Sequence, residues 1–393
     1  MKKKTKLDTR LIHTGSDPIN QKGAINPPVY RASTVIFPTV QAMEDAQKKK
    51  FDTTFYGVHG TPTTFALEDA MTELEGGYRA VSVSSGLAAI TTALITFLKS
   101  GDHLLMVDSV YGPTRNFCDT TLRNFGITTT YYDPLIGEKI KNLIKTETKV
   151  IFTESPGSYT FEIQDIPAIV NVAHKHDIKV MIDNTWSAGY YFKPFDHDVD
   201  ISIQATTKYQ AGHADVILGH IIAQTEQDWL KLKITTGALG QAVSPDVCYL
   251  ALRGVRTLSV RIEEHQKNAI EVANWLNKRP EVETVLHPAF PSCPGHEIWQ
   301  RDFIGSSGLF SIVLKDFSME QVNAMLNDMD YFAMGFSWGG YESLIVPCDP
   351  TKLRSATKWN ASGPLLRIHV GQEDVQDLIQ DLERGLSRLL GKN

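Results

Sequence analysis

The chain has 393 residues, of which 42% are hydrophobic and 21% charged, and its formal net charge is −6. This length and composition are typical of a globular protein of two or three domains, and the acidic balance argues against the basic face that nucleic-acid binding needs. The basic N-terminus is not followed by an apolar segment, and no apolar run reaches the roughly 18 residues of a membrane span, so we expect neither a secretory signal nor a membrane segment.

Residues 1–60 are rich in Pro, Thr and Asn, and they predict an irregular arm with one short helix near Val40–Lys50. Such an arm can bury little of its own surface. We therefore expect it to pack on something else, and a neighbouring subunit of the same protein is one candidate.

In residues 61–254, helical patterns alternate with short apolar strands. A helix over Thr64–Glu75 should stop at Gly76-Gly77, because glycine is a common helix C-terminal signal. A strand from Ala80, a helix over Gly86–Leu98 and a strand over His103–Val107 follow. Further strands are expected at Thr148–Phe152, Lys179–Asp183, Ile201–Ile203 and Val216–Ile222, and a helix at Ile166–His176. This alternation predicts an α/β domain with a mostly parallel sheet covered on both faces.

Residues 255–393 have a different pattern. Leu258–Asn277 predicts a long amphipathic helix with a charged face, which we expect to bridge to a smaller C-terminal α+β domain. In that domain Gly308–Leu314 is expected to form a strand and Val375–Leu390 a closing helix.

The four cysteines are far apart and form no Cys-x-x-Cys pair. This spacing argues against a zinc site or a disulfide framework, and it fits a reducing cytoplasm. We expect no metal site. Cys118 could be a nucleophile, but an ordinary buried thiol is the favoured interpretation.

Two polar residues follow apolar strands in a way that suggests cofactor chemistry. Asp183 ends the strand Lys179–Asp183, and Lys208 follows Ile201–Ile203 after a few Ser/Thr-type residues. Ligands of open α/β sheets bind at the carboxyl edge of the strands. A lysine there can bind an aldehyde as an imine, and the carboxylate can keep a pyridine nitrogen protonated. The alternative is a strand-end Asp and a solvated Lys, which are common in α/β proteins.

Three more elements could belong to the same site. Ser85-Gly86 stands between a strand and a helix, where free N–H groups can bind phosphate, although an ordinary N-cap looks the same. Tyr111 follows the strand that ends before Asp108 and could stack on a flat ring, or could simply be a turn residue. Arg367 lies inside an apolar strand, so its charge needs a partner: a structural ion pair or a substrate carboxylate.

Together these segments resemble the Cys/Met-metabolism family of pyridoxal phosphate (PLP) enzymes, of aspartate-aminotransferase-like fold (fold type I). The likeness runs over essentially the whole chain, and Asp200–Ala214, with Lys208 in Thr207-Lys208-Tyr209, is similar to the family's lysine signature. Gln210 and Ala214 are small departures from it. The stretch Ser337–Ser343, with Trp338 and Tyr341, is most similar to the bacterial cystathionine β-lyase branch.

The resemblance implies how the cofactor is held. Lys208 would form the Schiff base, Asp183 would pair with the pyridinium nitrogen, and Tyr111 would stack on the ring. The groups around the phosphate would be Ser85, Gly86, Leu87 and Thr207. Tyr56 would reach the phosphate or the active site from a neighbouring subunit, which needs at least a dimer, and the family suggests a homotetramer.

The resemblance also implies a reaction. Lys208, Tyr111 and Tyr56 would be the catalytic residues, and Arg367 would bind the substrate α-carboxylate with help from Ser337-Trp338 and Tyr111. The expected activity is α,β-elimination of L-cystathionine to homocysteine, pyruvate and ammonia, in methionine biosynthesis. Open alternatives are a γ-acting relative, a broader cysteine-S-conjugate β-lyase, and a non-catalytic homologue.

One position departs from the family pattern. The family usually has an arginine two residues after the tyrosine at position 56, donated across the dimer to the phosphate, but Val58 stands here. A charge-assisted contact of roughly 1.5–3 kcal/mol would be absent. His59 could replace it only in part. We therefore expect weaker cofactor retention than in a relative with the arginine.

Overall fold

The computed structural model describes residues 5–391, and in that range the named strands form two sheets. The first has the order β1-β7-β6-β5-β4-β2-β3. Its strands are β1 (Arg79–Val83), β2 (His103–Val107), β3 (Thr128–Tyr132), β4 (Thr148–Glu154), β5 (Lys179–Asp183), β6 (Ile201–Gln204) and β7 (Gly219–Ala223). β7 runs antiparallel to both of its neighbours, and the other pairs are parallel. The prediction of a mostly parallel sheet is confirmed.

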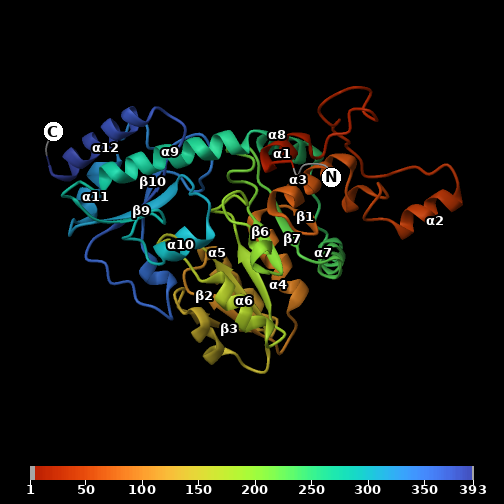
Figure 1. The fold of residues 1–393 in the computed structure, drawn as a ribbon, viewed down its shortest axis with the longest axis horizontal. Helices are drawn as coiled ribbons and strands as arrows, with labels where there is room; N and C mark the ends of the chain where they lie inside the picture. The colour runs from red at the N-terminus through yellow and green to blue at the C-terminus, as the bar shows by residue number, and fades with distance from the viewer. Residues whose placement is uncertain (1–4, 392–393) are drawn as a thin grey trace.

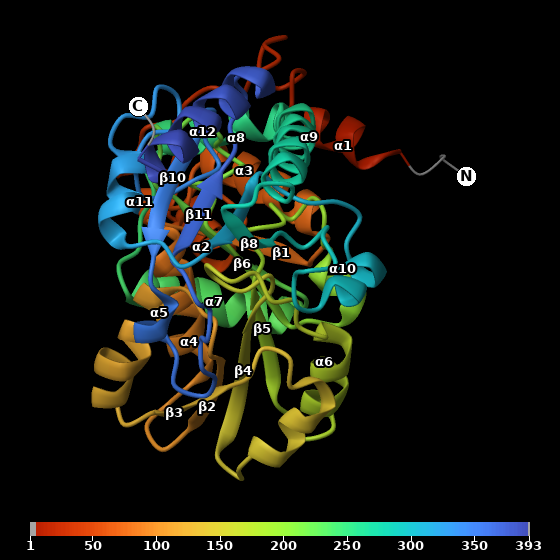
Figure 2. The ribbon, with the colours of Figure 1, turned by 90° about the vertical axis from the view of Figure 1, so that its left-hand side faces the viewer.

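Helices cover both faces of this sheet, and α4 and α6 lie on opposite sides of its central strands (Figure 2). The helices of this region are α3 (Pro62–Glu75), α4 (Gly86–Phe97), α5 (Gly112–Phe117), α6 (Ile166–His174), α7 (Glu226–Ala238) and α8 (Pro245–Arg256). Local signals set their ends. In α3, Thr61 caps the first turn, Pro62 occupies the first position, and Gly76 ends the helix with a φ of 89°.

The second sheet is antiparallel and has the order β10-β11-β9-β8. Its strands are β8 (Val282–Leu286), β9 (Leu309–Leu314), β10 (Leu344–Cys348) and β11 (Leu365–His369). The helices around it are α9 (Leu258–Leu276), α11 (Met319–Leu326) and α12 (Val375–Leu389). A further helix, α10 (His296–Asp302), packs through Ile298 and Trp299 on the core of the first sheet. The long helix α9 runs from the first sheet region to the second (Figure 1), as its charged amphipathic pattern suggested.

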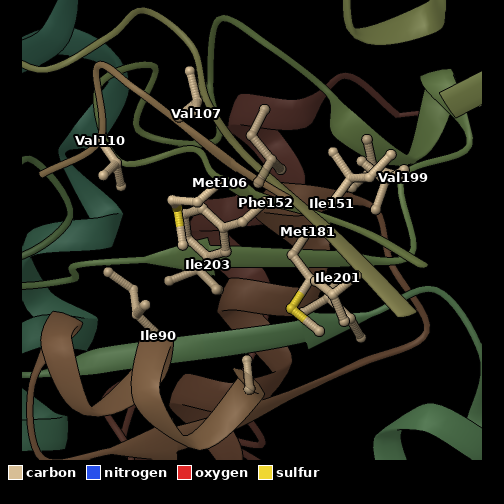
Figure 3. Packing of buried hydrophobic residues seen from close by; sticks show 14 of the residues in the cluster. Ile90, Met106, Val107, Val110, Ile151, Phe152, Met181, Val199, Ile201 and Ile203 are labelled. Atoms are coloured by element: carbon tan, nitrogen blue, oxygen red, sulfur yellow. The ribbon is translucent and has the colours of Figure 1, made fainter. Parts of the chain in front are cut away.

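Each sheet has its own core. Around the first sheet, Ile90 of α4 packs toward strand residues such as Met106, Phe152 and Ile203, all with at most 2% of their surface exposed (Figure 3). A second cluster joins α9, α11 and α12 to the antiparallel sheet. Large cores of this kind leave the carboxyl ends of the parallel strands in fixed positions, and the functional residues stand there.

The two helices of the N-terminal arm differ in how much surface they bury. α1 (Leu7–His13) packs on the body through Leu11, which is 2% exposed. α2 (Val40–Lys48) buries none of its residues and lies at the far end of an extension away from both sheets (Figure 1). The predicted helix near Val40–Lys50 is present, while α1 was not expected. Among residues 5–391, no helix has the length and apolar character that a membrane crossing requires.

Candidate active site

A cavity of about 730 Å³ opens between the two sheet regions. Its walls come from the carboxyl ends of β4, β5 and β6, the start of α4, the loop 336–342 and β11. Ligand sites of open α/β sheets are expected at this edge, and the volume is in the usual range for a small-molecule site. The predicted residues that line it are Ser85, Gly86, Leu87, Tyr111, Asp183, Thr207, Lys208, Ser337, Trp338 and Arg367.

Lys208 projects into the cavity from the loop after β6. Its Nζ donates a hydrogen bond to Ser337 Oγ at 2.5 Å and lies 5.2 Å from the ring centre of Trp338. Burial and the nearby Arg367 lower the lysine pKa to about 8, against the opposing effect of Asp183. A substantial fraction of this amine is therefore neutral near pH 8, the form that can attack an aldehyde or accept a proton.

Asp183 and Glu154 form a pair of carboxyl groups at the strand ends. They stand opposite each other in the register of β4 and β5, and both line the cavity. Burial raises the pKa of Asp183, although hydrogen bonds from Thr185 oppose this. The pKa of Glu154 is raised well above its ordinary value by burial and by Asp183, and its Oε2 accepts the Tyr111 N–H at 2.7 Å. Because two negative charges this close would repel each other, the two carboxyl groups are expected to carry one negative charge between them.

Glu154 was not among the predicted site residues. The signal that identified Asp183, a carboxylate at the end of a buried strand, was equally present in the segment Thr148–Glu154. The sequence pattern did not show that the two strands are neighbours. That pairing is what brings the two carboxyl groups together.

The start of α4 offers unused donors to the cavity. Ser85 is the N-cap, and its Oγ accepts the Ala88 N–H at 3.0 Å. Among the described residues, the N–H groups of Gly86 and Leu87 have no acceptor, as expected for the first turn of a helix. A Cβ on Gly86 would lie 2.5 Å from that of Ala205, so only glycine lets the helix start this close to the sheet. Free N–H groups and the helix dipole suit a phosphate.

Thr207 lies beside this cradle, but its hydroxyl is already engaged. Oγ1 donates to the Leu218 carbonyl at 3.1 Å and accepts the Leu218 N–H at 3.0 Å. Contact with a phosphate would need the hydroxyl to rotate away from this carbonyl. Thr207 therefore lies beside the proposed phosphate site as predicted, while its hydroxyl donates to the Leu218 carbonyl.

Arg367 has no carboxylate partner in residues 5–391, which removes the structural ion pair as an explanation for its place in β11. Its Nη2 donates to the Ser337 carbonyl at 3.2 Å, and the guanidinium lies 5.9 Å from the ring centre of Tyr159. The side chain lines the cavity, and the ion pairs found within residues 5–391 do not include it. A guanidinium in this state is well suited to a substrate carboxylate.

Tyr111 and Tyr56 differ in their placement. Tyr111 caps α5 and lines the cavity, with 44% of its surface exposed. Tyr56 and Val58 do not line the cavity of their own chain, and Tyr56 is 45% exposed. Cys118, the one cysteine considered as a nucleophile, is buried, and burial raises the pKa of its thiol to about 12. It behaves as a packing residue.

The donor set fits a phosphorylated pyridine aldehyde. A partly neutral amine, a buried carboxylate, an aromatic ring and an unfilled helix N-terminus face one cavity. These groups match the aldehyde, the ring nitrogen, the ring face and the phosphate of PLP, respectively.

Comparison with known proteins points the same way. The sequence model of the family described as Cys/Met metabolism PLP-dependent enzyme matches residues 8–387. A cystathionine beta-lyase of Haemophilus influenzae is 46% identical, covering 99% of this chain and 100% of that protein. An L-alanine/L-glutamate racemase of Wolbachia pipientis is 41% identical, with 98% of each chain covered. The crystal structure of metB from Corynebacterium glutamicum has a TM-score of 0.91 at 30% identity, covering 98% of this chain and 99% of that chain.

The family match extends over nearly the whole chain, and relatives above 40% identity cover it almost completely. The site geometry is independent of these comparisons and leads to the same cofactor. The chain therefore belongs to the Cys/Met metabolism family of PLP-dependent enzymes, and its cofactor is pyridoxal phosphate.

Proposed function

We propose that this enzyme is a carbon–sulfur lyase that converts L-cystathionine and water into homocysteine, pyruvate and ammonia, within methionine biosynthesis. The observation that carries the proposal is a PLP-type cavity in which an unpaired Arg367 and the amine of Lys208 both face the space beside the Ser337-Trp338 segment. The similarity to a protein named cystathionine beta-lyase, which extends over nearly the full length of both chains, supplies the substrate class.

Substrate binding is assigned to the C-terminal side of the cavity. Arg367 would bind the α-carboxylate through two parallel N–H···O bonds, while Ser337 and Trp338 limit the space around it. This anchoring would orient the Cα–H bond toward Lys208, so that the reacting atoms are held together instead of meeting by diffusion.

Proton transfer is assigned to Lys208. When bound, PLP supplies an electron sink for the charge that develops at Cα. The Lys208 amine would remove the Cα proton, and Asp183 would keep the ring nitrogen protonated. The Cβ–S bond would then break as a Cα=Cβ double bond forms, and homocysteine would leave with a proton from Lys208 or a tyrosine, of which Tyr111 lines the cavity. Water would hydrolyse the remaining three-carbon fragment to pyruvate and ammonia.

The test is a product assay with purified holoenzyme. Cystathionine should yield pyruvate and free homocysteine, whereas a γ-acting enzyme would yield 2-oxobutyrate and cysteine. Converting Lys208 to Ala should abolish turnover and the visible absorbance of the lysine-bound cofactor. Turnover that survives this substitution would exclude the assigned role. Parallel assays with cystine and other cysteine S-conjugates would define how strictly cystathionine is preferred.

Racemisation is a second candidate because the Wolbachia relative carries that name at 41% identity. Racemisation needs proton return to the opposite face of Cα, and Lys208 and Tyr111 both line the cavity. Incubation of the enzyme with L-alanine or L-glutamate, followed by chiral separation, tests it directly. Racemisation without pyruvate from cystathionine would replace the lyase proposal.

The assembly is proposed as a homo-oligomer in the cytoplasm, at least a dimer and in the family pattern a tetramer. The arm 24–60 supports this, since α2 buries no residue in its own chain and Tyr56 stands outside its own cavity. Domain limits at residues 60/61 and 254/255 are proposed from the change in sequence pattern, and the second limit falls in the last turn of α8, just before α9 begins. Sedimentation analysis of the purified protein measures the oligomeric state.

A further inference from the structure

His369 is a fully buried residue of β11, 1% exposed, and the mechanism above does not use it. It lies two positions after Arg367 and therefore on the same face of the strand. Both of its ring nitrogens are occupied. Nε2 lies 3.0 Å from the Gly339 N–H, which can only donate, and Nδ1 lies 3.1 Å from the Glu342 carbonyl, which can only accept. The ring is therefore neutral, with its proton on Nδ1.

Both partners belong to one segment, residues 337–342, which holds the substrate side of the cavity. This segment has an unusual backbone: Ser337 has a φ of +79° and Gly339 a φ of +86°. A non-glycine residue in the left-handed region costs free energy and persists only where surrounding contacts hold it. The two bonds from His369 are contacts of this kind.

The same segment is pressed against the reactive lysine. A Cβ on Gly339 would lie 2.8 Å from the Tyr209 nitrogen and 2.9 Å from the carbonyl carbon of Lys208. Ser337 accepts from Lys208 Nζ through its hydroxyl and from Arg367 Nη2 through its carbonyl. A shift of the segment would therefore displace the amine and the guanidinium at once.

Contacts other than those of His369 fix the far end of the segment. The far end of the segment is fixed at Ser343, whose N–H and hydroxyl both donate to Glu373. Between Ser337 and Ser343, the Gln372 N–H donates to the Tyr341 carbonyl at 2.9 Å, while the Gly339 N–H and the Glu342 carbonyl both bond the His369 ring. Tyr209 and His265 pack on its ring at centroid distances of 6.0 and 5.2 Å, which prevents the imidazole from turning away.

We propose that His369 is the positioning residue that sets the substrate-carboxylate subsite, by holding residues 337–342 in the conformation that presents Ser337 and Trp338 beside Lys208. The substrate class it serves is an amino acid whose α-carboxylate binds Arg367, so this inference rests on the proposed function. Its action is indirect, since the imidazole contacts the segment and not the substrate.

The test compares His369→Phe, which keeps the ring and removes both bonds, with His369→Gln, whose amide oxygen can still accept from Gly339. The matched control is His287→Phe. His287 is equally buried, and its Nδ1 accepts the backbone N–H of Ala289 at 3.1 Å, outside the segment. Hydrogen exchange of peptides covering 336–342 is measured in the holoenzyme, together with kcat and KM for cystathionine.

We expect His369→Phe to speed exchange in this segment at least tenfold and to raise KM roughly tenfold with a smaller change in kcat, with partial recovery in His369→Gln. His287→Phe should leave exchange in the segment unchanged. Unchanged exchange in His369→Phe, or an equal increase in His287→Phe, would overturn the proposal. If no variant and no wild-type enzyme turned over cystathionine, the exchange result would still decide the role of His369, while the proposed function would fail separately.

Discussion

At the scale of single residues, the Glu154–Asp183 pair should share one negative charge. The pKa of Glu154 is raised well above its ordinary value, because the group is buried and Asp183 stands in the paired position. Glu154→Gln keeps the shape and the acceptor for the Tyr111 N–H, so we expect kcat/KM within about threefold of wild type. Glu154→Leu removes the acceptor and should lower kcat/KM about fivefold, since a lost hydrogen bond is worth about 1 kcal/mol.

A large loss of activity in Glu154→Gln would contradict the shared charge. If Glu154→Gln were as damaging as Glu154→Leu, the carboxylate would carry a charge that the reaction uses. The absorbance of the lysine-bound cofactor should be unchanged in Glu154→Gln under the shared-charge interpretation, which gives a second readout in the same samples.

Val58 should weaken the hold on the cofactor phosphate. Val58→Arg adds a guanidinium that a neighbouring subunit can donate, and a charge-assisted bond of about 1.5–3 kcal/mol corresponds to a gain of roughly 10–150-fold in affinity. Titration of apo-enzyme with PLP measures the change. Val58→Gln, neutral and of similar length, is the control, and it should gain little. No gain in Val58→Arg would mean that a side chain at position 58 does not contact the cofactor phosphate.

The residues that sequence reasoning found share a feature that can be seen without a structure. Asp183 ends an apolar strand and Lys208 follows one after a few residues, so the rule that ligands meet the carboxyl edge identified them. Glu154 and His369 were missed because their roles depend on a neighbour: a paired strand in one case, and a segment about thirty residues away in the other. Hydrophobic pattern carries no information about such tertiary partners.

At the scale of elements, the start of α4 should act as cap and phosphate cradle together. Ser85→Ala removes the acceptor for the Ala88 N–H, which costs about 1 kcal/mol of stability, and also a hydroxyl facing the cavity. We expect a modest fall in the unfolding free energy of the apo-enzyme and a further, roughly tenfold loss of PLP affinity. Denaturant unfolding and PLP titration measure the two effects separately.

Ser318→Ala is the matched control for this prediction. Ser318 caps α11 with a capping box and does not line the cavity. It should cost a similar stability and leave PLP affinity unchanged. If the two variants lost affinity equally, the effect of Ser85 would be one of global stability and not of phosphate binding.

Elements were predictable where a single pattern dominates. α3, α4, α9 and α12 lie within two residues of their expected ranges, because apolar periodicity and capping residues agree. β3 was missed, since it is an edge strand whose first four residues are exposed or half-buried and form no apolar run, and only Tyr132 is buried. The reversed direction of β7 was also not visible, because strand pattern does not encode whether the partner is parallel.

At the scale of the whole molecule, two buried carboxylates join the C-terminal region to the first sheet. Asp108, at the end of β2, pairs with Arg115 at 2.5 Å and accepts N–H groups from Ser355, Ala356 and Thr357. Nearby, Glu162 pairs with Arg354 at 2.7 Å, and both side chains are less than 10% exposed. These contacts hold the segment 354–357 beside the cavity wall that carries Tyr111 and Tyr159.

The Asp108 contacts should make stability depend on pH in a definite window. Burial alone would raise the pKa of this carboxyl, but the hydrogen bonds from Ser355, Ala356 and Thr357 outweigh it, and the pKa lies below its ordinary value of 3.8. A group with a lowered folded-state pKa binds fewer protons folded than unfolded. Its contribution is therefore complete above about pH 5 and is lost as the pH falls through the folded-state pKa.

Asp108→Asn tests this directly. Near pH 7 the variant leaves Arg115 buried without its partner, which should cost about 3–5 kcal/mol of unfolding free energy. The difference between wild type and variant should shrink as the pH falls below about 5, since the wild-type carboxylate also loses its charge. Asp316→Asn changes an exposed carboxylate for which the described residues offer no hydrogen bond or ion pair, and it should change stability by less than about 0.5 kcal/mol at either pH. Because the contacts of Asp108 bridge the two sheet regions, a constant difference between wild type and variant from pH 7 to pH 3 would mean that packing, and not this carboxylate, holds the regions together around the cavity.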